Sequence, residues 1–161
     1  MRIGVVSDTH NNLPNVRKIV ALFNEAGVDR VVHTGDITQS KVLHAFSELN
    51  APMVGVFGNN DHDPEGLATI ASSLGFDFVH PPLELNWHSR KILVVHDPRD
   101  FEGVLDSSFH LALHGHTHLH THYESDDGVV FNPGESAGMM AGYNRIGVVD
   151  LETLQAEVLY F

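Results

Sequence analysis

The sequence of 161 residues contains no cysteine. This absence excludes disulfide bonds, thiolate-bound zinc and cysteine nucleophiles, so any metal ion must be held by nitrogen and oxygen atoms. Long hydrophobic runs are missing as well, because no apolar stretch approaches the roughly 18 residues of a membrane-spanning helix. Polar Ser7 and Asp8 also interrupt the N-terminus before the core of a signal peptide could form. We therefore expect a cytoplasmic protein with no role at a membrane.

Basic residues are scarce, since nine Lys and Arg face 21 Asp and Glu and leave a formal net charge of −12 at pH 7. A surface of this sign repels polyanions, so we expect no non-specific binding to a nucleic-acid backbone. Bound cations would neutralise part of the charge. Histidine, by contrast, is plentiful: the chain has 13, and six of them fall between His110 and His122. This density favours a metal site or a site that handles phosphate.

Length and composition predict a soluble globular protein with a single domain over residues 1–161. The length is close to the roughly 150 residues of a typical domain. Hydrophobic residues make up 42% and charged residues 19%, which is neither a disordered nor a fibrous composition. The chain is therefore long enough to bury a core without outside help.

Short apolar runs alternate with helical stretches in the first half of the chain. The runs are residues 2–6, 29–36 and 52–61. The helices are expected from Asn12 and Pro14 to Gly27, from Ser40 as an N-cap to about Asn50, and from Asp63 and Pro64 onward. Because crossover connections place helices over a sheet, this order predicts a largely parallel sheet covered on both faces.

The second half of the chain departs from this alternation. After Gly75, strand-like segments are interrupted by Pro81, by Pro82 and by a turn near Ser89, and further strand-like segments follow residue 110. Strands in such close succession are joined by turns and not by helices. We therefore expect them to add antiparallel strands and to make the sheet mixed.

Five separate apolar runs end in residues of the types that bind metal ions. They supply, in chain order, Asp8 with His10, Asp36, Asn59, His96, and His116 with His118. In open α/β sheets, sites form outside the carboxyl ends of the strands, so these segments are expected to meet in one crevice. The members of each pair are two positions apart, which places both side chains on one side of an extended chain. Glycines at positions 35, 58 and 115 come before ligands and permit tight or left-handed turns.

These carboxylates, imidazoles and one amide form a mixed nitrogen and oxygen shell. It suits Mn, Fe, Zn, Co or Ni, and it is too rich in imidazole for Ca or Mg alone. Seven such residues exceed what one ion needs. Two ions about 3.5 to 4 Å apart, sharing a bridging carboxylate, would use all seven and would form a clamp for in-line attack on phosphorus.

The same residues stand in short motifs that follow one another along the chain. The motifs are DTH (8–10), GD (35–36), GNND (58–61), VVH (94–96) and GHTH (115–118), followed by NPGES (132–136). With this series the chain resembles the calcineurin-like metallophosphoesterases, in particular their small single-domain phosphodiesterases. The resemblance extends from Asp8 to Ser136. It implies an α/β fold, a layered sandwich of mixed β-sheets flanked by helices.

The resemblance also implies two divalent metal ions, with manganese preferred and Fe, Zn, Ni, Co or Mg as alternatives. It assigns Asp8, His10 and His118 to the first ion, Asn59, His96 and His116 to the second, and Asp36 to a bridge between them. A hydroxide between the ions would attack a small phosphoester substrate, because a catalytic metal lowers the pKa of bound water from about 15.7 towards about 7. The residues expected to act in catalysis are Asp36, Asn59, Asn60 and Asp61.

The third motif departs from the pattern of many relatives, which have histidine where this chain has Asn60. In those relatives the histidine is associated with protonating the leaving group, and an amide cannot act as a general acid. We therefore expect diesters and good leaving groups to be cleaved better than alkyl monoesters. Asp61 is expected to orient a neighbouring group or a bound water. His62 either replaces the missing acid or faces solvent.

A second departure follows His96, where relatives often have glycine and histidine and this chain has Asp97, Pro98 and Arg99. Arg99 either meets the substrate phosphate or lies on the surface in a loop. Two rival functions are a protein-interaction scaffold of the same fold and a nucleotide sensor without turnover. The intact set of seven ligands favours an enzyme over both. The sequence leaves a homodimer open.

Overall fold

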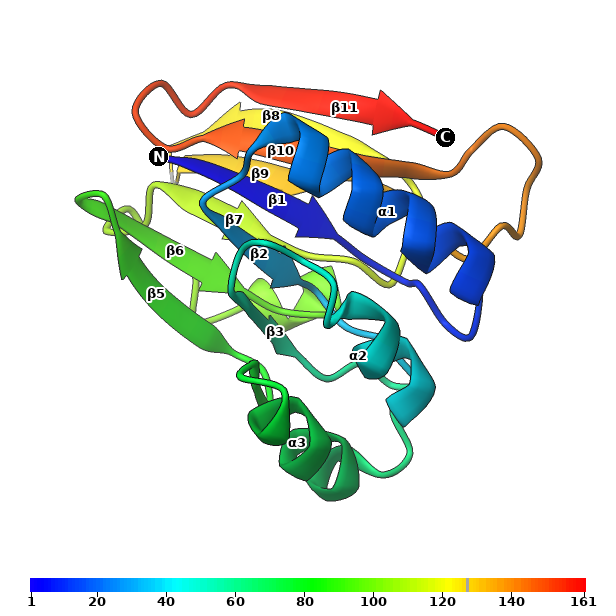
Figure 1. Cartoon of the computed structure of the whole chain (residues 1–161). Coiled ribbons are helices and arrows are strands. Elements are labelled where there is room, and N and C mark those ends of the chain that lie inside the picture. Colours follow the sequence, from blue (N-terminus) through cyan, green and yellow to red (C-terminus); the bar gives the residue numbers. More distant parts are fainter. Residues whose placement is uncertain (127) are drawn as a thin grey trace.

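The computed structural model describes residues 1–126 and 128–161, and the strands within them form two sheets (Figure 1). The first sheet has the order β11 (Ala156–Tyr160), β10 (Arg145–Asp150), β1 (Arg2–Val6), β2 (Arg30–His33), β3 (Met53–Val56) and β4 (Asp77–Val79). The second has the order β5 (Leu83–Trp87), β6 (Arg90–Val94), β7 (Leu111–Leu113), β9 (Gly128–Asn132) and β8 (Thr121–Ser125). The helices are α1 (Leu13–Ala26), α2 (Ser40–Phe46), α3 (Pro64–Ser73) and the short 3-10 helix η1 (Pro98–Phe101).

Both sheets mix parallel and antiparallel pairs. Strands β1 to β4 are parallel, as the alternation of strands and helices predicts, and β10 and β11 extend that sheet in antiparallel pairs. In the second sheet β6, β7 and β9 are parallel, and β5 and β8 are antiparallel edge strands. The strands after Gly75 therefore do more than extend one sheet, because most of them build a second one.

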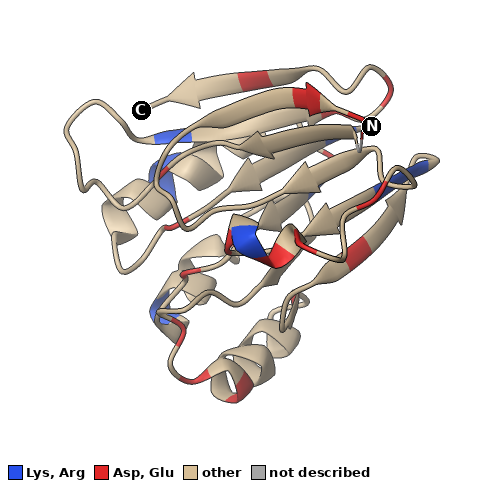
Figure 2. Ribbon diagram, turned by 180° about the vertical axis from the view of Figure 1, so that it is seen from behind, with Lys and Arg blue, Asp and Glu red and all other residues tan. Residues whose placement is uncertain are grey.

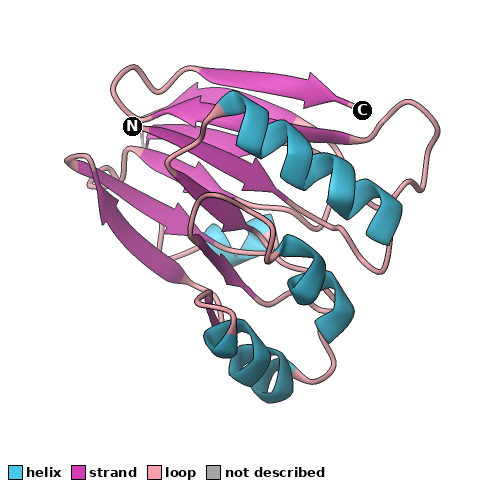
Figure 3. Ribbon diagram, viewed as in Figure 1, coloured by secondary structure: helices cyan, strands magenta, loops and turns pink. Residues whose placement is uncertain are grey.

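The two sheets pack face to face, and α1, α2 and α3 cover the outer face of the first sheet (Figure 3). This arrangement corrects the expectation of helices on both faces. Successive side chains of a strand point to opposite faces, so Val31 of β2 packs in the core under the helices, whereas Val32 packs in the core between the sheets. The predicted layered sandwich of mixed sheets flanked by helices is confirmed.

Polar residues set most of the helix ends. The Asn12 side chain accepts a hydrogen bond from the Asn15 N–H at 3.2 Å, and α1 ends at Gly27 in the left-handed conformation, as predicted. Asp63 caps α3 in the same way, accepting from the Gly66 N–H at 3.1 Å. The prediction for α2 was wrong in two respects. Its N-cap is residue 39, which makes no side-chain capping bond, and the helix ends at residue 46 instead of about residue 50.

Strands β1, β2 and β3 of the first sheet and β6 and β7 of the second end at one edge of the molecule (Figure 1). The predicted ligands follow these strands. On the outer face of the second sheet, Phe101 and Leu105 pack against Leu93 and Val95, so the segment that contains η1 is held close to this edge.

Among the described residues, none of the helices has the length and apolar character needed to span a membrane.

Candidate metal centre

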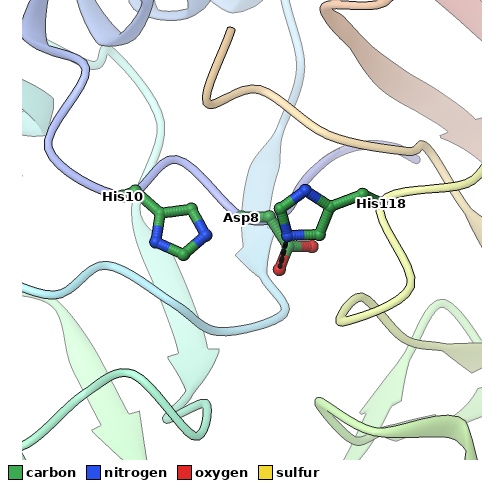
Figure 4. Close-up of side chains that lie close together, drawn as sticks. All are labelled: Asp8, His10 and His118. Carbon is green, nitrogen blue, oxygen red and sulfur yellow. Dashed lines mark ion pairs between the residues drawn. The ribbon is translucent and has the colours of Figure 1, made fainter. Parts of the chain in front are cut away.

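Asp8, His10 and His118 form the first of two groups of potential ligands. One donor atom from each lies within 4.8 Å of the others. In Figure 4 a dashed line joins the Asp8 carboxylate to His118, and Asp8 Oδ1 is 3.4 Å from His118 Nε2. These are the three residues that the resemblance assigned to one ion.

The second group lies around Asn59. Its Oδ1 is 3.0 Å from His96 Nε2 and 2.9 Å from His116 Nδ1, and the two ring nitrogens are 3.3 Å apart. Asp36 Oδ1 is 3.5 Å from His96 Nε2. Asp36 therefore stands beside the three residues that the resemblance assigned to the other ion.

The carboxylates connect the two groups. Asp36 Oδ2 is 3.7 Å from His10 Nε2, while Asp36 Oδ1 faces His96. Donor atoms of Asp8, Asp36 and His96 also lie within 4.8 Å of one another. The structure thus brings all seven predicted ligands into one continuous cluster at the shared strand edge.

Several atoms in this cluster fit a cation better than a hydrogen-bond partner. Asp8 Oδ1 and His10 Nε2 are buried, and neither atom has a hydrogen-bond partner. His96 Nδ1 is 2.9 Å from the Thr34 carbonyl oxygen, which can only accept, so in a neutral ring Nε2 carries the lone pair. That lone pair faces acceptor oxygens of Asn59 and Asp36 with no proton between them. Divalent cations at the two groups would satisfy these atoms as ligands.

The ligand positions share an unusual backbone conformation. Five of them have a left-handed φ between 43° and 66°, namely Asp8, His10, Asp36, His116 and His118. Non-glycine residues rarely adopt this region, and strain of this kind gathers at functional sites. The finding corrects the expectation that alternation along an extended strand places the paired ligands, because β1 and β7 have already ended where these turns begin.

Two of the three predicted glycines are explained by a lack of space for a side chain and not by a left-handed backbone conformation. Gly35 has φ 110°, as expected for a left-handed turn, but neither Gly58 nor Gly115 is among the positive-φ residues. A Cβ on Gly58 would clash with Asp36 Oδ1 and would lie 2.7 Å from the Asp36 backbone nitrogen, and a Cβ on Gly115 would clash with Ser7 Oγ. A side chain at either position would therefore displace groups in or beside the predicted ligands.

Asn60 and Asp61 hold the loop that carries Asp36. Asn60 donates to the Asp36 carboxylate from its backbone N–H at 2.9 Å and from its side-chain amide at 2.8 Å. Asp61 accepts from the backbone N–H groups of Asp36, Thr38 and Gly58 at 3.0, 2.6 and 2.7 Å. Both residues therefore touch the predicted bridging carboxylate or its backbone, and Asp61 orients a neighbouring group.

The electrostatics of the cluster favour a charged Asp8. Burial raises the pKa of the Asp8 carboxyl, but contacts with His118 and Ser7 outweigh it and lower the pKa below its ordinary value. The same carboxylate raises the pKa of His118. Burial also raises the pKa of Asp61, against the backbone N–H donors that lower it. A charged carboxylate beside imidazole nitrogens supplies the mixed oxygen and nitrogen ligands that divalent transition metals take.

His62 and Arg99, for which the sequence allowed either a role in the site or a place on the surface, lie at the border of the cluster. His62 is exposed and belongs to neither ligand group. Arg99 is exposed, but its guanidinium binds Asp97, and that pairing holds the pKa of the Asp97 carboxyl at about 2. Both Arg99 and Asp97 line a cavity of about 540 Å³ that Asn59, His96 and His116 also line.

Sequence reasoning missed the contacts of three polar residues around the cluster. Asp97 Oδ2 lies 3.4 Å from His116 Nε2. The buried Asn132 side chain donates to the Gly115 carbonyl and to Thr117 Oγ1, both at 3.1 Å, and so holds the loop of GHTH. Glu135 is fully buried and accepts from the backbone N–H groups of residues 139 and 140. The only sequence signal for these contacts is that Asn132 and Glu135 belong to the NPGES motif (132–136).

Comparisons with known proteins agree with this architecture. A family model described as the calcineurin-like phosphoesterase superfamily domain matches residues 1–154. A phosphodiesterase of Methanocaldococcus jannaschii is 34% identical over 162 residues, with 94% of each chain covered. The phosphodiesterase YfcE of Escherichia coli is 22% identical, with 99% of this chain and 92% of the relative covered. A solved archaeal phosphodiesterase superposes over the whole of both chains with a TM-score of 0.93 and 31% identity. The chain belongs to the calcineurin-like phosphoesterase superfamily.

Proposed function

We propose that this chain is a metal-dependent phosphodiesterase that hydrolyses a small phosphate diester at a centre of two divalent cations. The observation that carries the proposal is the meeting of seven potential nitrogen and oxygen ligands from five segments, with two of their buried atoms, Asp8 Oδ1 and His10 Nε2, left without a hydrogen-bond partner. The names of the similar archaeal and bacterial phosphodiesterases support the same reaction.

In this proposal Asp8, His10 and His118 hold one cation, and Asn59, His96 and His116 hold the other, with Asp36 shared. Manganese is the proposed ion, because the mixed nitrogen and oxygen shell suits it. When bound, two such cations would supply a hydroxide nucleophile near neutral pH and would offset charge on the phosphoryl oxygens.

The residues around this centre position its ligands. Asn60 fixes both oxygens of the Asp36 carboxylate, and Asp61 ties the backbone of residues 36, 38 and 58 together. The Thr34 carbonyl sets the orientation of the His96 ring. These hydrogen bonds hold the ligands in place before any substrate binds, which lowers the reorganisation that the reaction requires.

Asn60 also bears on the choice of substrate. Its amide cannot give a proton to a departing alkoxide, and general acid catalysis contributes roughly 10²- to 10⁴-fold in rate. Substrates whose leaving group is stable as an anion do not need that proton. We therefore propose aryl and similar diesters as better substrates than alkyl monoesters.

The complete ligand set separates this function from its rivals. An interaction scaffold has no need of seven intact ligands, and a sensor without turnover finds support only in Asn60. Lasting nucleotide binding with no product in the presence of Mn²⁺ would favour the sensor.

The test combines metal analysis with a substrate panel. Purified protein is incubated with Mn²⁺, its metal content is measured, and hydrolysis of bis(p-nitrophenyl) phosphate is compared with that of phosphoserine. We expect close to two ions per chain and faster turnover of the diester. Asp36→Asn should bind fewer than two ions per chain. It should also lower kcat/KM by more than the roughly 10- to 100-fold loss that is typical for residues that contact the ligands.

Asp77→Asn is the matched control, because Asp77 is an exposed residue of β4 outside the ligand groups. It should leave both readouts at the level of the unmodified protein. The proposal fails if no metal binds under saturating Mn²⁺, if no phosphoester is hydrolysed, or if both variants behave alike. Faster hydrolysis of phosphoserine would overturn the diester preference alone.

A further inference from the structure

A cavity adjoins the cluster on the side of Asn59, His96 and His116. Its volume is about 540 Å³, within the range of roughly 300 to 1,000 Å³ that is typical of small-molecule sites. The other walls come from the start of α3, from residues 80–81 between β4 and β5, and from residues 97–100 at η1. A group attached to a phosphate at the cluster has room to lie here.

The charged residues of these walls are mostly acidic. Asp61, Asp97 and Asp100 line the cavity, and among the described lining residues Arg99 is the only Lys or Arg. Figure 2 shows both signs of charge on η1, within a molecule that carries many more acidic than basic positions. Apart from the proposed ligands Asn59, His96 and His116, the cavity wall therefore has an excess of negative charge.

The one guanidinium is already occupied. Arg99 Nε lies 3.1 and 3.0 Å from the two oxygens of Asp97, and its Nη2 lies 2.5 Å from one of them. A bidentate pair of this kind is among the stronger ionic contacts of proteins. The cavity thus offers no uncommitted guanidinium or ammonium group to a second phosphate or a carboxylate.

The remaining wall suits a ring. The His80 and Phe57 rings stand edge to face with centroids 5.6 Å apart, and Pro64 and Pro81 line the same cavity. Exposed His80 has its Nε2 3.7 Å from Glu65, so this imidazole also faces an acidic partner. Aromatic and proline surfaces favour flat, apolar groups over charged ones.

We propose that this cavity receives one of the two ester groups of the diester and selects an uncharged, ring-bearing group against one with a further negative charge. The inference rests on the proposed function. Away from the proposed ligands, which the substrate phosphate itself would face, the cavity wall offers an added anion no uncommitted guanidinium or ammonium group, and Asp100 and Asp61 repel the anion. Substrates with one phosphate between two uncharged groups therefore fit best.

The experiment uses the Mn²⁺-loaded protein and three aryl diesters. Phenyl p-nitrophenyl phosphate is the uncharged reference. The second diester carries a carboxylate on the phenyl ring, and the third carries one on the nitrophenyl leaving group. The measured quantity is the ratio of kcat/KM for the reference to kcat/KM for each charged diester, which reports discrimination on each side of the phosphate.

Asp100→Lys reverses one charge on the cavity wall, and Glu25→Lys makes the same change at the end of α1 that lies away from the site. We expect Asp100→Lys to reduce the discrimination ratio by about five- to tenfold for at least one of the two charged diesters. The substitution removes one repulsive contact and adds one attractive contact, and this factor is the size expected for two exposed charge contacts. Asp100→Asn should produce a smaller shift in the same direction, and Glu25→Lys should produce none.

Binding gives a second readout that does not depend on turnover. The affinity of the Mn²⁺-loaded protein is measured for phenylphosphonate and for 4-carboxyphenylphosphonate, and Asp100→Lys should narrow the difference between them. The inference is overturned if neither the kinetic ratios nor the binding difference separates Asp100→Lys from Glu25→Lys. It is also overturned if the unmodified protein prefers the charged diesters. Absence of any diester hydrolysis would instead defeat the proposed function.

Discussion

Asp97 contacts one of the proposed ligands, His116. Its carboxylate lies 3.4 Å from His116 Nε2, on the opposite side of the ring from the Nδ1 that faces Asn59. A carboxylate behind a ligating imidazole fixes the ring and raises its basicity, and its loss typically costs about 10- to 100-fold in metal affinity. We therefore expect Asp97→Ala to weaken binding of one of two Mn²⁺ ions by that factor in titration calorimetry.

Asp100→Ala is the control for this prediction, since Asp100 is an acidic neighbour for which the structure gives no contact with His116. It removes the same charge and should leave both Mn²⁺ affinities within error of the unmodified protein. Equal affinities in Asp97→Ala and Asp100→Ala would show that the contact with His116 has no effect on the ligand.

His33 makes stability depend on pH. Its ring is fully buried, Nδ1 accepts from the Gly35 N–H at 3.1 Å, and burial lowers its pKa from 6.5 to about 3. Below pH 6.5 the unfolded chain binds a proton at this ring, whereas the folded protein binds it only near pH 3. The free energy of unfolding therefore falls as the pH drops, by about 1.4 kcal/mol per pH unit for one proton.

The measurement compares urea unfolding of the metal-free protein with that of His33→Asn at pH 5.5 and pH 4.5. Asparagine keeps an acceptor for the Gly35 N–H but does not titrate. The free energy of unfolding of His33→Asn therefore lacks the pH dependence that comes from this one proton, whatever the overall stability of the variant. The unmodified protein should lose about 1.4 kcal/mol more than His33→Asn over that unit. Parallel slopes would contradict a buried, neutral His33.

At the scale of single residues, the sequence indicates which side chains meet but not how they are held. Polar residues at the ends of apolar runs are visible in one dimension, and all seven of them cluster. The left-handed φ angles of Asp8 and His116 are not visible, because aspartate and histidine also occur in ordinary turns. The contact between Asp97 and His116 joins separate loops, and no local pattern indicates it.

Among the helices, α3 depends on one capping residue. Asp63 accepts from the Gly66 N–H, and Pro64 begins the helix at a position where no backbone donor is needed. Replacing such a cap with alanine typically costs about 1 kcal/mol. We expect Asp63→Ala to reduce the free energy of unfolding in urea by this amount and Asp63→Ser to retain most of it. Equal losses in the two variants would mean that the cap is not the cause.

The elements that the sequence predicts well are those whose ends carry a local signal. Asn12 and Gly27 delimit α1, and Asp63 begins α3. Helix α2 has no capping side chain at its start, and it ends at residue 46, earlier than the sequence predicts. The second sheet was expected only as added strands. Pairing partners such as β7 and β9 are separated along the chain, so nothing local says whether they extend the first sheet or build another.

For the whole molecule, the cluster joins the two sheets of the sandwich. Asp8, Asp36 and Asn59 follow strands of the first sheet, and His96 and His116 follow strands of the second. Cations bound between them, as proposed, would favour the state in which the sheets are packed together, because the unfolded chain does not assemble the ligands. Metal binding should therefore stabilise the fold as a unit.

We expect Mn²⁺ at 100 times its dissociation constant to raise the free energy of unfolding by about 2.7 kcal/mol for a single site, and a chelator to reverse the gain. Thermal unfolding with and without Mn²⁺ measures this, and it needs no substrate. Asp36→Asn should show a much smaller shift, because Asp36 faces ligands from both groups, while Asp77→Asn should shift as the unmodified protein does. An unmodified protein whose unfolding ignores Mn²⁺, or an Asp36→Asn variant that responds in full, would mean that the cations do not hold the two sheets together.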